Sequence, residues 1–318
     1  MRRKLATALV TLWVALTFTF VLIRQMPGDI LHNWALQIQE QQKVPYEEAR
    51  RMAAAILNYD PDEPLAEQYA RYVGGLARGD LGTSLTYRIP VTTILAWCLP
   101  WTLFLTILSL AVSFTAGTAL GLWVASRRRS WLDPALTFYA TLTQAVPDFL
   151  IGVLLLVVFG VALGWFPLRG AYSLDGTPFA LDVLRHAALP VLAFALPSVG
   201  GWALAMRASA VSVLGEDFLQ VAQAKGLSPG RILVRYLGRN SILPLIAGLP
   251  AAFGSMLGGT MLIESVFGYP GVGYFLAQAV ATRDYTLMQG LFLVFTAATV
   301  GGNLAAEWVS RRLDPRLR

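Results

Sequence analysis

The sequence predicts an all-α integral membrane protein with six transmembrane helices and an extracytoplasmic helical insertion after the first helix. Three observations predict this fold class. Of the 318 residues, 56% are hydrophobic and only 14% are charged, whereas about 25% of the residues in an average soluble domain are charged. Six stretches remain apolar over the ~20 residues that a helix needs to cross a bilayer. Lysine and arginine gather in alternate segments between these stretches, as the positive-inside rule requires.

The six apolar stretches are almost free of charge. The first could be a cleaved signal peptide, but it lacks a small-residue cleavage site before Arg24 and, at 19 residues, is long for one; a retained helix is the better prediction. The third contains a single charge, Asp148, which is either an intramembrane functional carboxylate or, because it comes early in its run, a residue near the cytoplasmic interface. The predicted spans are 5–23, 99–126, 134–168, 187–206, 240–263 and 285–306.

The distribution of basic residues predicts that both termini are cytoplasmic. Clusters of Lys and Arg occupy residues 2–4, 127–129, 225–239 and 311–318, whereas the two short outside loops hold only isolated arginines. Basic residues in short flanking segments are retained on the cytoplasmic side of the membrane. This asymmetry explains the net charge of +6 and gives no reason to expect a nucleic-acid partner.

The predicted extracytoplasmic region, residues 24–98, has two helical patterns. The first opens after Pro45 and the second after Pro64, with Gly79 as the end of the second. With Cys98 as the only cysteine, no internal disulfide can stabilise this region. The apolar faces comprise Tyr46, Ala49, Met52, Ala53, Ile56 and Leu57 in the first pattern, and Leu65, Tyr69, Tyr72, Val73 and Leu76 in the second.

Residues 216–244 predict two short helices joined by a tight turn on the cytoplasmic side. The first helix opens with acidic residues, which its dipole favours, and Gly226 is placed to end it. Ser228 offers a hydroxyl N-cap to the second helix, with Pro229 in its first turn.

The second of these helices is amphipathic and basic. One face carries Ile232, Leu233, Tyr236 and Leu237, and another carries Arg231, Arg235 and Arg239. Such a basic stripe fits two interpretations, contact with anionic lipid headgroups or contact with a cytosolic partner protein.

The sequence lacks three common motifs for nucleotide binding, acyl transfer and metal binding. There is no P-loop, no G-x-S-x-G and no H-E-x-x-H. His32 and His186 are therefore predicted to be surface or loop residues rather than metal ligands. We also predict that the chain is not an enzyme and that it carries no metal or cofactor. A secondary transporter or channel working without ATPase subunits is the main alternative to a partnered transporter, but it would need ionisable groups at membrane depth. A membrane-embedded enzyme or a purely structural anchor fits the motifs less well.

The segment VAQAKGLSPGRILVRYLGRNSILP, residues 221–244, resembles the cytoplasmic EAA loop of ABC importer permeases of the dipeptide/oligopeptide (peptide/nickel) family. The chain departs from that family at Gln220, Val221 and Ala222, where the name-giving motif reads Glu-Ala-Ala, so the usual contact of the Glu is not expected here. Further segments resemble the family in its order: VLIRQMPGD (21–29), LARGDLGTS (76–84), ESVFGYPGVG (264–273), RDYTLMQG (283–290) and LDPRLR (313–318).

The resemblance implies a type I ABC importer permease in a bacterial or archaeal cytoplasmic membrane. It implies a second homologous permease chain, two ABC ATPase subunits that hold ATP and Mg²⁺, and an extracytoplasmic substrate-binding protein as partners. The implied cargo is a dipeptide, an oligopeptide, a nickel chelate, glutathione or an oligosaccharide, carried along a path lined by the second to fifth helices.

The implied organisation is a first transmembrane helix (1–23), an extracytoplasmic region (24–98) and a five-helix core (99–318) with a coupling loop at 215–241. The expected ATPase contacts are Gln220, Ala222, Ala224, Lys225, Gly226, Leu227 and Arg231, and the expected contacts with the binding protein are Tyr46, Tyr69, Tyr72 and Asp80.

Overall fold

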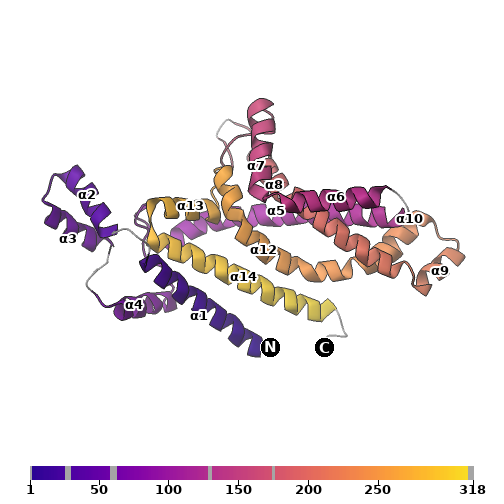
Figure 1. Ribbon diagram of the computed structural model, residues 1–318, viewed down its shortest axis with the longest axis horizontal. Helices are drawn as coiled ribbons and strands as arrows, with labels where there is room; N and C mark the ends of the chain where they lie inside the picture. Colours follow the sequence, from indigo (N-terminus) through magenta and orange to yellow (C-terminus); the bar gives the residue numbers. More distant parts are fainter. Residues whose placement is uncertain (1, 26–29, 58–62, 128–130, 174–175, 314–318) are drawn as a thin grey trace. The chain divides into compact units, whose positions relative to one another are not determined.

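The computed structural model describes residues 2–25, 30–57, 63–127, 131–173 and 176–313, and this part of the chain is helical without a named β-strand (Figure 1). It forms two compact units, Met1–Cys98 with Phe275–Ala297, and Leu99–Tyr274 with Ala298–Arg318. The helices are α1 (Arg2–Arg24), α2 (Ile30–Gln42), α3 (Tyr46–Leu57), α4 (Leu65–Ala77), α5 (Val91–Ser126), α6 (Leu132–Ala145), α7 (Asp148–Leu155), the π-helical η1 (Leu156–Ala162), α8 (Phe179–Val213), α9 (Asp217–Ala224), α10 (Pro229–Arg231), the π-helical η2 (Ile232–Gly238), α11 (Arg239–Ser241), α12 (Leu243–Val266), α13 (Val272–Thr282) and α14 (Tyr285–Leu313).

Each predicted transmembrane stretch coincides with helical structure, which confirms the predicted fold class. Among the described residues, α5, α8 and the Tyr285–Ala305 part of α14 are long and apolar enough to cross a membrane. Two bent pairs, Leu132–Ala145 with Asp148–Ala162 and Pro229–Ser241 with Leu243–Gly259, add two spans if each pair counts as one. The first predicted span corresponds to the shorter apolar helix Ala6–Leu22.

The stretch 134–168, predicted as one helix, is divided into two helical segments, Leu132–Ala145 and Asp148–Ala162. The chain bends by 95° between α6 and α7, because Pro147 has no N–H to donate and disfavours helical geometry at the preceding residue. Val146 is accordingly extended, with φ −101° and ψ 125°. Asp148, the residue with two open interpretations, begins α7, where the helix dipole favours its negative charge.

The fourth predicted span is part of a longer helix, and this corrects the prediction for His186. Helix α8 begins at Phe179, directly after Pro178, so His186 lies within it. The His186 side chain is buried, and its Nδ1 lies 2.9 Å from the Asp182 carbonyl oxygen and 3.2 Å from Asp182 Oδ1. His186 is therefore a packed helical residue and not the predicted surface or loop residue.

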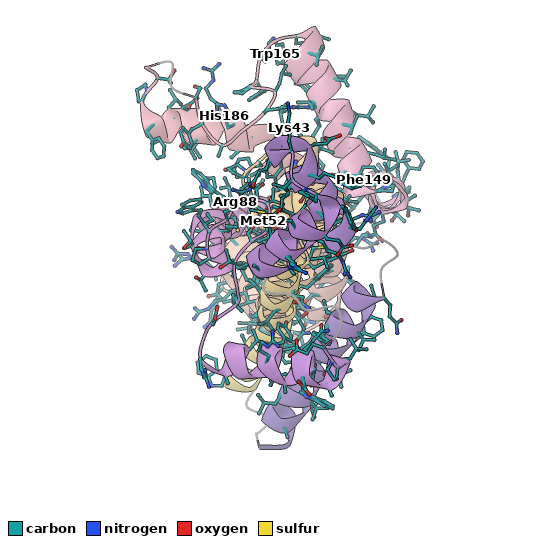
Figure 2. All side chains as sticks on the ribbon, turned by 90° about the vertical axis from the view of Figure 1, so that its left-hand side faces the viewer. Lys43, Met52, Arg88, Phe149, Trp165 and His186 are labelled. Atoms are coloured by element: carbon teal, nitrogen blue, oxygen red, sulfur yellow. The ribbon has the colours of Figure 1, made fainter. Side chains whose placement is uncertain are left out.

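Between the first and second predicted spans, the described residues form the three complete helices α2, α3 and α4. Helices α3 and α4 begin after Pro45 and Pro64, as predicted, whereas α2 was not predicted. The α2–α3 hairpin, which carries Lys43 and Met52 (Figure 2), has a small core of its own made by Leu31, Ala35, Ile38, Ala49 and Ala53.

The second unit holds its long helices close together through small residues. Gly200 of α8 faces α6, and a Cβ added there would lie 2.7 Å from the Ala140 Cα. A Cβ on Gly121 of α5 would likewise collide with the Ala203 carbonyl oxygen of α8. Small residues at such contacts let membrane helices approach closely and gain van der Waals packing.

A buried carboxyl group fixes the connection between α12 and α13. Glu264 is 0% exposed; its Oε1 accepts a hydrogen bond from Thr102 Oγ1 at 2.8 Å, and its Oε2 accepts one from the Gly273 N–H at 2.7 Å. Thr102 Oγ1 in turn accepts a hydrogen bond from the Val272 N–H at 2.7 Å. The first N–H groups of α13, which have no partners within their own helix, are thus satisfied from α12 and α5.

Glu264→Ala should lower the thermal unfolding midpoint of the purified chain in detergent. The substitution leaves buried donors without an acceptor, which costs about 1–3 kcal/mol for each group. Intrinsic tryptophan fluorescence during heating measures the midpoint. Glu40→Ala, at an exposed position of α2, is the matched control and should leave the midpoint unchanged; equal midpoints for both variants would show that the Glu264 contacts do not stabilise the fold.

Candidate functional site

The predicted turn after α9 is a complete helix-ending motif. Gly226 has φ +72°, a left-handed conformation that glycine adopts at little cost. The Gly226 N–H donates to the Gln223 carbonyl at 2.9 Å, and the Leu227 N–H donates to the Ala222 carbonyl at 3.3 Å. These two bonds form the Schellman motif, which satisfies the last carbonyl groups of a helix. The prediction that Gly226 ends this helix is confirmed.

The second helix of the hairpin runs without a break through α10, η2 and α11. Pro229 occupies its first turn, as predicted. Ser228 takes the N-cap position, but its hydroxyl makes no capping hydrogen bond, so the predicted hydroxyl cap is wrong. Ser228 and Gly230 are both exposed, and water can satisfy N–H groups at an exposed helix end.

Residues 217–241, which we call the coupling hairpin, are anchored to the long helices of their unit. Leu219 of α9 and Leu237 of η2 are buried in one cluster with Ala125 of α5 and Ala210 of α8. The Ser209 hydroxyl of α8 also donates to the Ser241 carbonyl at 2.8 Å. The predicted apolar face is confirmed, since the side chains that flank this cluster include Ile232, Leu233 and Tyr236.

The outer surface of the hairpin holds most of the expected contact residues. Ala222 is the exception, because it is only 2% exposed and lies inside the chain's own packing; it supports the turn and offers no contact surface. Val221, which is 52% exposed, and Phe218, which is also exposed, are not among the expected contacts. Leu227 is half-buried, and the exposed residues of the expected set are Gln220, Ala224, Lys225, Gly226 and Arg231.

Two of the four residues expected to contact a binding protein are occupied by contacts within their own unit. The Tyr69 hydroxyl lies 2.6 Å from Thr17 Oγ1, and the Tyr72 ring stacks on Phe20 with centroids 5.6 Å apart. Burial, with a smaller contribution from Tyr69, raises the pKa of Tyr72 to about 12. Both tyrosines therefore hold α4 against α1.

The other two expected residues are more accessible. Tyr46 is half-buried, and its hydroxyl lies 2.7 Å from His32 Nδ1. Asp80 is exposed, and its Oδ1 accepts a hydrogen bond from the Gly82 N–H at 2.8 Å. Asp80 thus shapes the turn that leads back to α5.

Asp284 joins two of the segments noted in the sequence, 76–84 and 283–290. Its buried carboxylate accepts hydrogen bonds from the Ser84 hydroxyl at 2.5 Å and the Thr86 N–H at 2.9 Å. Its other oxygen accepts one from the Leu287 N–H at 3.0 Å and caps α14. An acidic residue before a helical pattern can be recognised in a sequence as a capping signal. The sequence does not show that Ser84, 200 residues away, binds this carboxylate.

Comparison with known proteins identifies the family. Residues 117–318 match the family described as "Binding-protein-dependent transport system inner membrane component". The chain belongs to this family. The permease is 28% identical over 317 residues to the oligopeptide transport system permease protein AppB of Bacillus subtilis (strain 168), covering 99% of this chain and 98% of the relative. It is 30% identical over 334 residues to the di/tripeptide transport system permease protein DppB of Pseudomonas aeruginosa (strain UCBPP-PA14), covering 99% and 97%.

A further relative is the glutathione transport system permease protein GsiC of Escherichia coli (strain K12), 30% identical over 316 residues with 99% of this chain and 97% of the relative covered. Among solved structures, a chain of the MetNI methionine ABC transporter, described in inward facing conformations, aligns with a TM-score of 0.57 at 15% identity. The alignment covers 70% of this chain and 97% of that one, and it shows a shared fold. The predicted resemblance to ABC importer permeases of the dipeptide/oligopeptide family is confirmed.

Leu219→Ala should loosen the coupling hairpin. Truncating a buried leucine costs about 2–5 kcal/mol, and here the lost contacts are those that hold α9 against α5 and α8. Hydrogen–deuterium exchange of the intact chain in detergent should show faster exchange over residues 217–241. Val221→Ala, at an exposed site on the same helix, should exchange like the unmodified chain; no difference between the two variants would refute the anchoring role of Leu219.

Proposed function

We propose that this chain forms half of the translocation pathway of an ATP-driven importer for peptides or a related small solute. In this proposal the coupling hairpin receives the movement of cytosolic ATPase subunits. The observation that carries the proposal is the hairpin itself, which is closed by the Gly226 turn and anchored on α5 and α8. It is a rigid element with an exposed outer face, in a family whose members are transport components.

The proposed complex contains a second homologous permease chain, two ABC ATPase subunits that bind ATP and Mg²⁺, and an extracytoplasmic substrate-binding protein. Both termini of this chain and the coupling hairpin are cytoplasmic in the membrane of a bacterium or archaeon. The positions of the basic clusters support this orientation. Residues 1–23, 24–98 and 99–318 serve as first helix, extracytoplasmic region and permease core.

The proposed mechanism is a rigid-body transmission. ATP binding brings the two ATPase subunits together and displaces the hairpin with them. Because Leu219 and Leu237 tie the hairpin to α5 and α8, the displacement changes the packing of these long helices and switches the pathway from inward-facing to outward-facing. This rigid-body transmission requires a stiff hairpin and does not require a catalytic group.

The contact with the ATPase is formed by the exposed residues Gln220, Ala224, Lys225 and Gly226, with Val221 and Phe218 adding apolar area. Ala222 and Leu227 support this face from within. Charged groups are few here, which suits insertion into a groove on a protein, where packing and shape complementarity dominate.

The cargo is a peptide or a glutathione-like solute in this proposal. Relatives along the whole chain are named for oligopeptides, di/tripeptides and glutathione. The binding protein selects the cargo and docks on residues 24–98, where Tyr46 and Asp80 remain accessible. A transporter working without ATPase subunits, the alternative from the sequence, finds no support among these relatives.

Gly226→Glu should abolish ATP-driven uptake and leave the chain in the membrane. A glutamate at φ +72° is strained and places a charge in the proposed contact face. Uptake of a labelled peptide by proteoliposomes that contain the whole complex measures the effect. Gly176→Glu adds the same charge at another exposed glycine, with φ +87° and open space around it, outside the coupling loop, and should retain uptake. Unchanged uptake by the Gly226 variant contradicts the coupling role.

Replacing residues 30–57 by a short Gly-Ser linker should impair stimulation of the transporter by its binding protein. The change removes α2 and α3 together with their own core, so it leaves neither helix with an uncovered apolar face. Binding-protein-stimulated ATP hydrolysis should fall toward the unstimulated rate, while membrane insertion and ATPase binding persist. Full stimulation of this variant would exclude the α2–α3 hairpin as the docking site.

A further inference from the structure

The second helix of the coupling hairpin presents a basic face that the ATPase contact does not use. Arg231, Arg235 and Arg239 are all exposed, and within the described part of the chain none of them forms an ion pair. The opposite face of this helix is buried on α5 and α8. The three guanidinium groups are therefore held on a fixed backbone and point away from the chain's own packing.

Two of these arginines line a hollow in the surface. This hollow is a shallow, open depression between side chains of one helix, with a volume of about 480 Å³, and it is lined by Gly230, Arg231, Val234 and Arg235. Val234, the apolar side chain of this lining, is 64% exposed. A guanidinium group binds phosphate oxygens through two parallel hydrogen bonds, so this hollow can hold a phosphate group next to an apolar side chain.

The position of the helix favours a lipid as the source of this phosphate. The segment Pro229–Ser241 bends by 52° into Leu243–Gly259, an apolar part of a candidate span. Arg239 is thus four residues before the start of α12. A helix that combines basic residues with an exposed apolar side chain at this level matches the composition of interfacial helices, and the cytoplasmic leaflet supplies anionic headgroups.

The outer face of α9 differs in composition. It exposes Gln220, Val221 and Ala224, with Lys225 as its cation at the turn. The first helix also exposes two acidic residues at its start, Glu216 and Asp217. Positive charge is thus concentrated on the second helix, while the outer face of the first is neutral to acidic. This separation favours two different partners for the two helices.

We propose that the hollow lined by Gly230, Arg231, Val234 and Arg235 binds the phosphate of an anionic lipid headgroup in the cytoplasmic leaflet. Arg231 and Arg235 bind the phosphate, Val234 contacts the acyl boundary, and Arg239 faces neighbouring headgroups. The bound lipid fixes the height of the coupling hairpin relative to the bilayer. This assignment rests on the cytoplasmic placement of the hairpin in the proposed function, and it moves Arg231 from the ATPase contact to the lipid contact.

The test measures lipid retention by the full chain. Native mass spectrometry of the detergent-purified protein, with equal amounts of phosphatidylglycerol and phosphatidylcholine added, should show preferential retention of phosphatidylglycerol. Arg231→Gln with Arg235→Gln should reduce this retention on the order of tenfold. Val234→Glu, which keeps both arginines and puts a negative charge into the hollow, should also reduce it. Arg50→Gln with Arg51→Gln on α3 removes the same charge elsewhere and should change nothing.

Two further experiments distinguish a lipid headgroup from free phosphate as the ligand, and the lipid from the ATPase as the partner of the arginines. Excess inorganic phosphate should leave phosphatidylglycerol bound; displacement would show a site for free phosphate and overturn the lipid assignment. ATPase subunits should bind the unmodified chain and the double glutamine variant equally in phosphatidylcholine nanodiscs. Weaker binding by the variant would assign the arginines to the ATPase. Equal phosphatidylglycerol retention by all variants would overturn the lipid assignment. A chain that binds no ATPase at all yet retains phosphatidylglycerol would refute the proposed function and leave the lipid site standing.

Discussion

In the proposed mechanism, movement at the hairpin reaches the membrane through the apolar contact that seats the coupling hairpin on α5 and α8. Leu219 and Leu237 bury their side chains against Ala125 and Ala210, and the small alanines let the helices approach closely. Because protein interiors are close-packed and resist compression, we expect a displacement of α9 to be passed to α8. The Gly226 turn contributes by closing the hairpin with hydrogen bonds rather than with a flexible loop.

Buried carboxyl groups perform a comparable task at other helix ends. Glu264 satisfies the start of α13 in one unit, and Asp284 satisfies the start of α14 in the other. Each of them also binds a hydroxyl from a distant segment, Thr102 or Ser84. Helix N-termini favour negative charge and need acceptors, so one side chain both completes a helix and joins it to another part of its unit.

The sequence predicted features that depend on local physical chemistry. The lengths of the apolar stretches predicted the positions of the spans. Gly226 and Pro229 predicted the position of the hairpin turn, because glycine permits positive φ and proline fixes φ whatever the tertiary contacts are. Features that depend on tertiary contacts were missed. His186 lies in the unpredicted N-terminal extension of α8 and is buried there. Ala222 faces inward because of the packing of α9. One partner of Glu264, Thr102, is 162 positions away in the sequence. Pro147 itself is a local signal for the bend, but the prediction of one helix was based on the length of the apolar stretch alone.

In the proposed mechanism the hairpin and α8 move as one body, and the distance between them reports whether they do. In a Cys98→Ala background, spin labels at Gln223 of α9 and Val211 of α8, both exposed, report their separation in the reconstituted complex by double electron–electron resonance. We expect the same narrow distance distribution without nucleotide and with ATP bound. A distribution that shifts or broadens when ATP binds would show that the hairpin moves independently of α8, and would contradict rigid coupling.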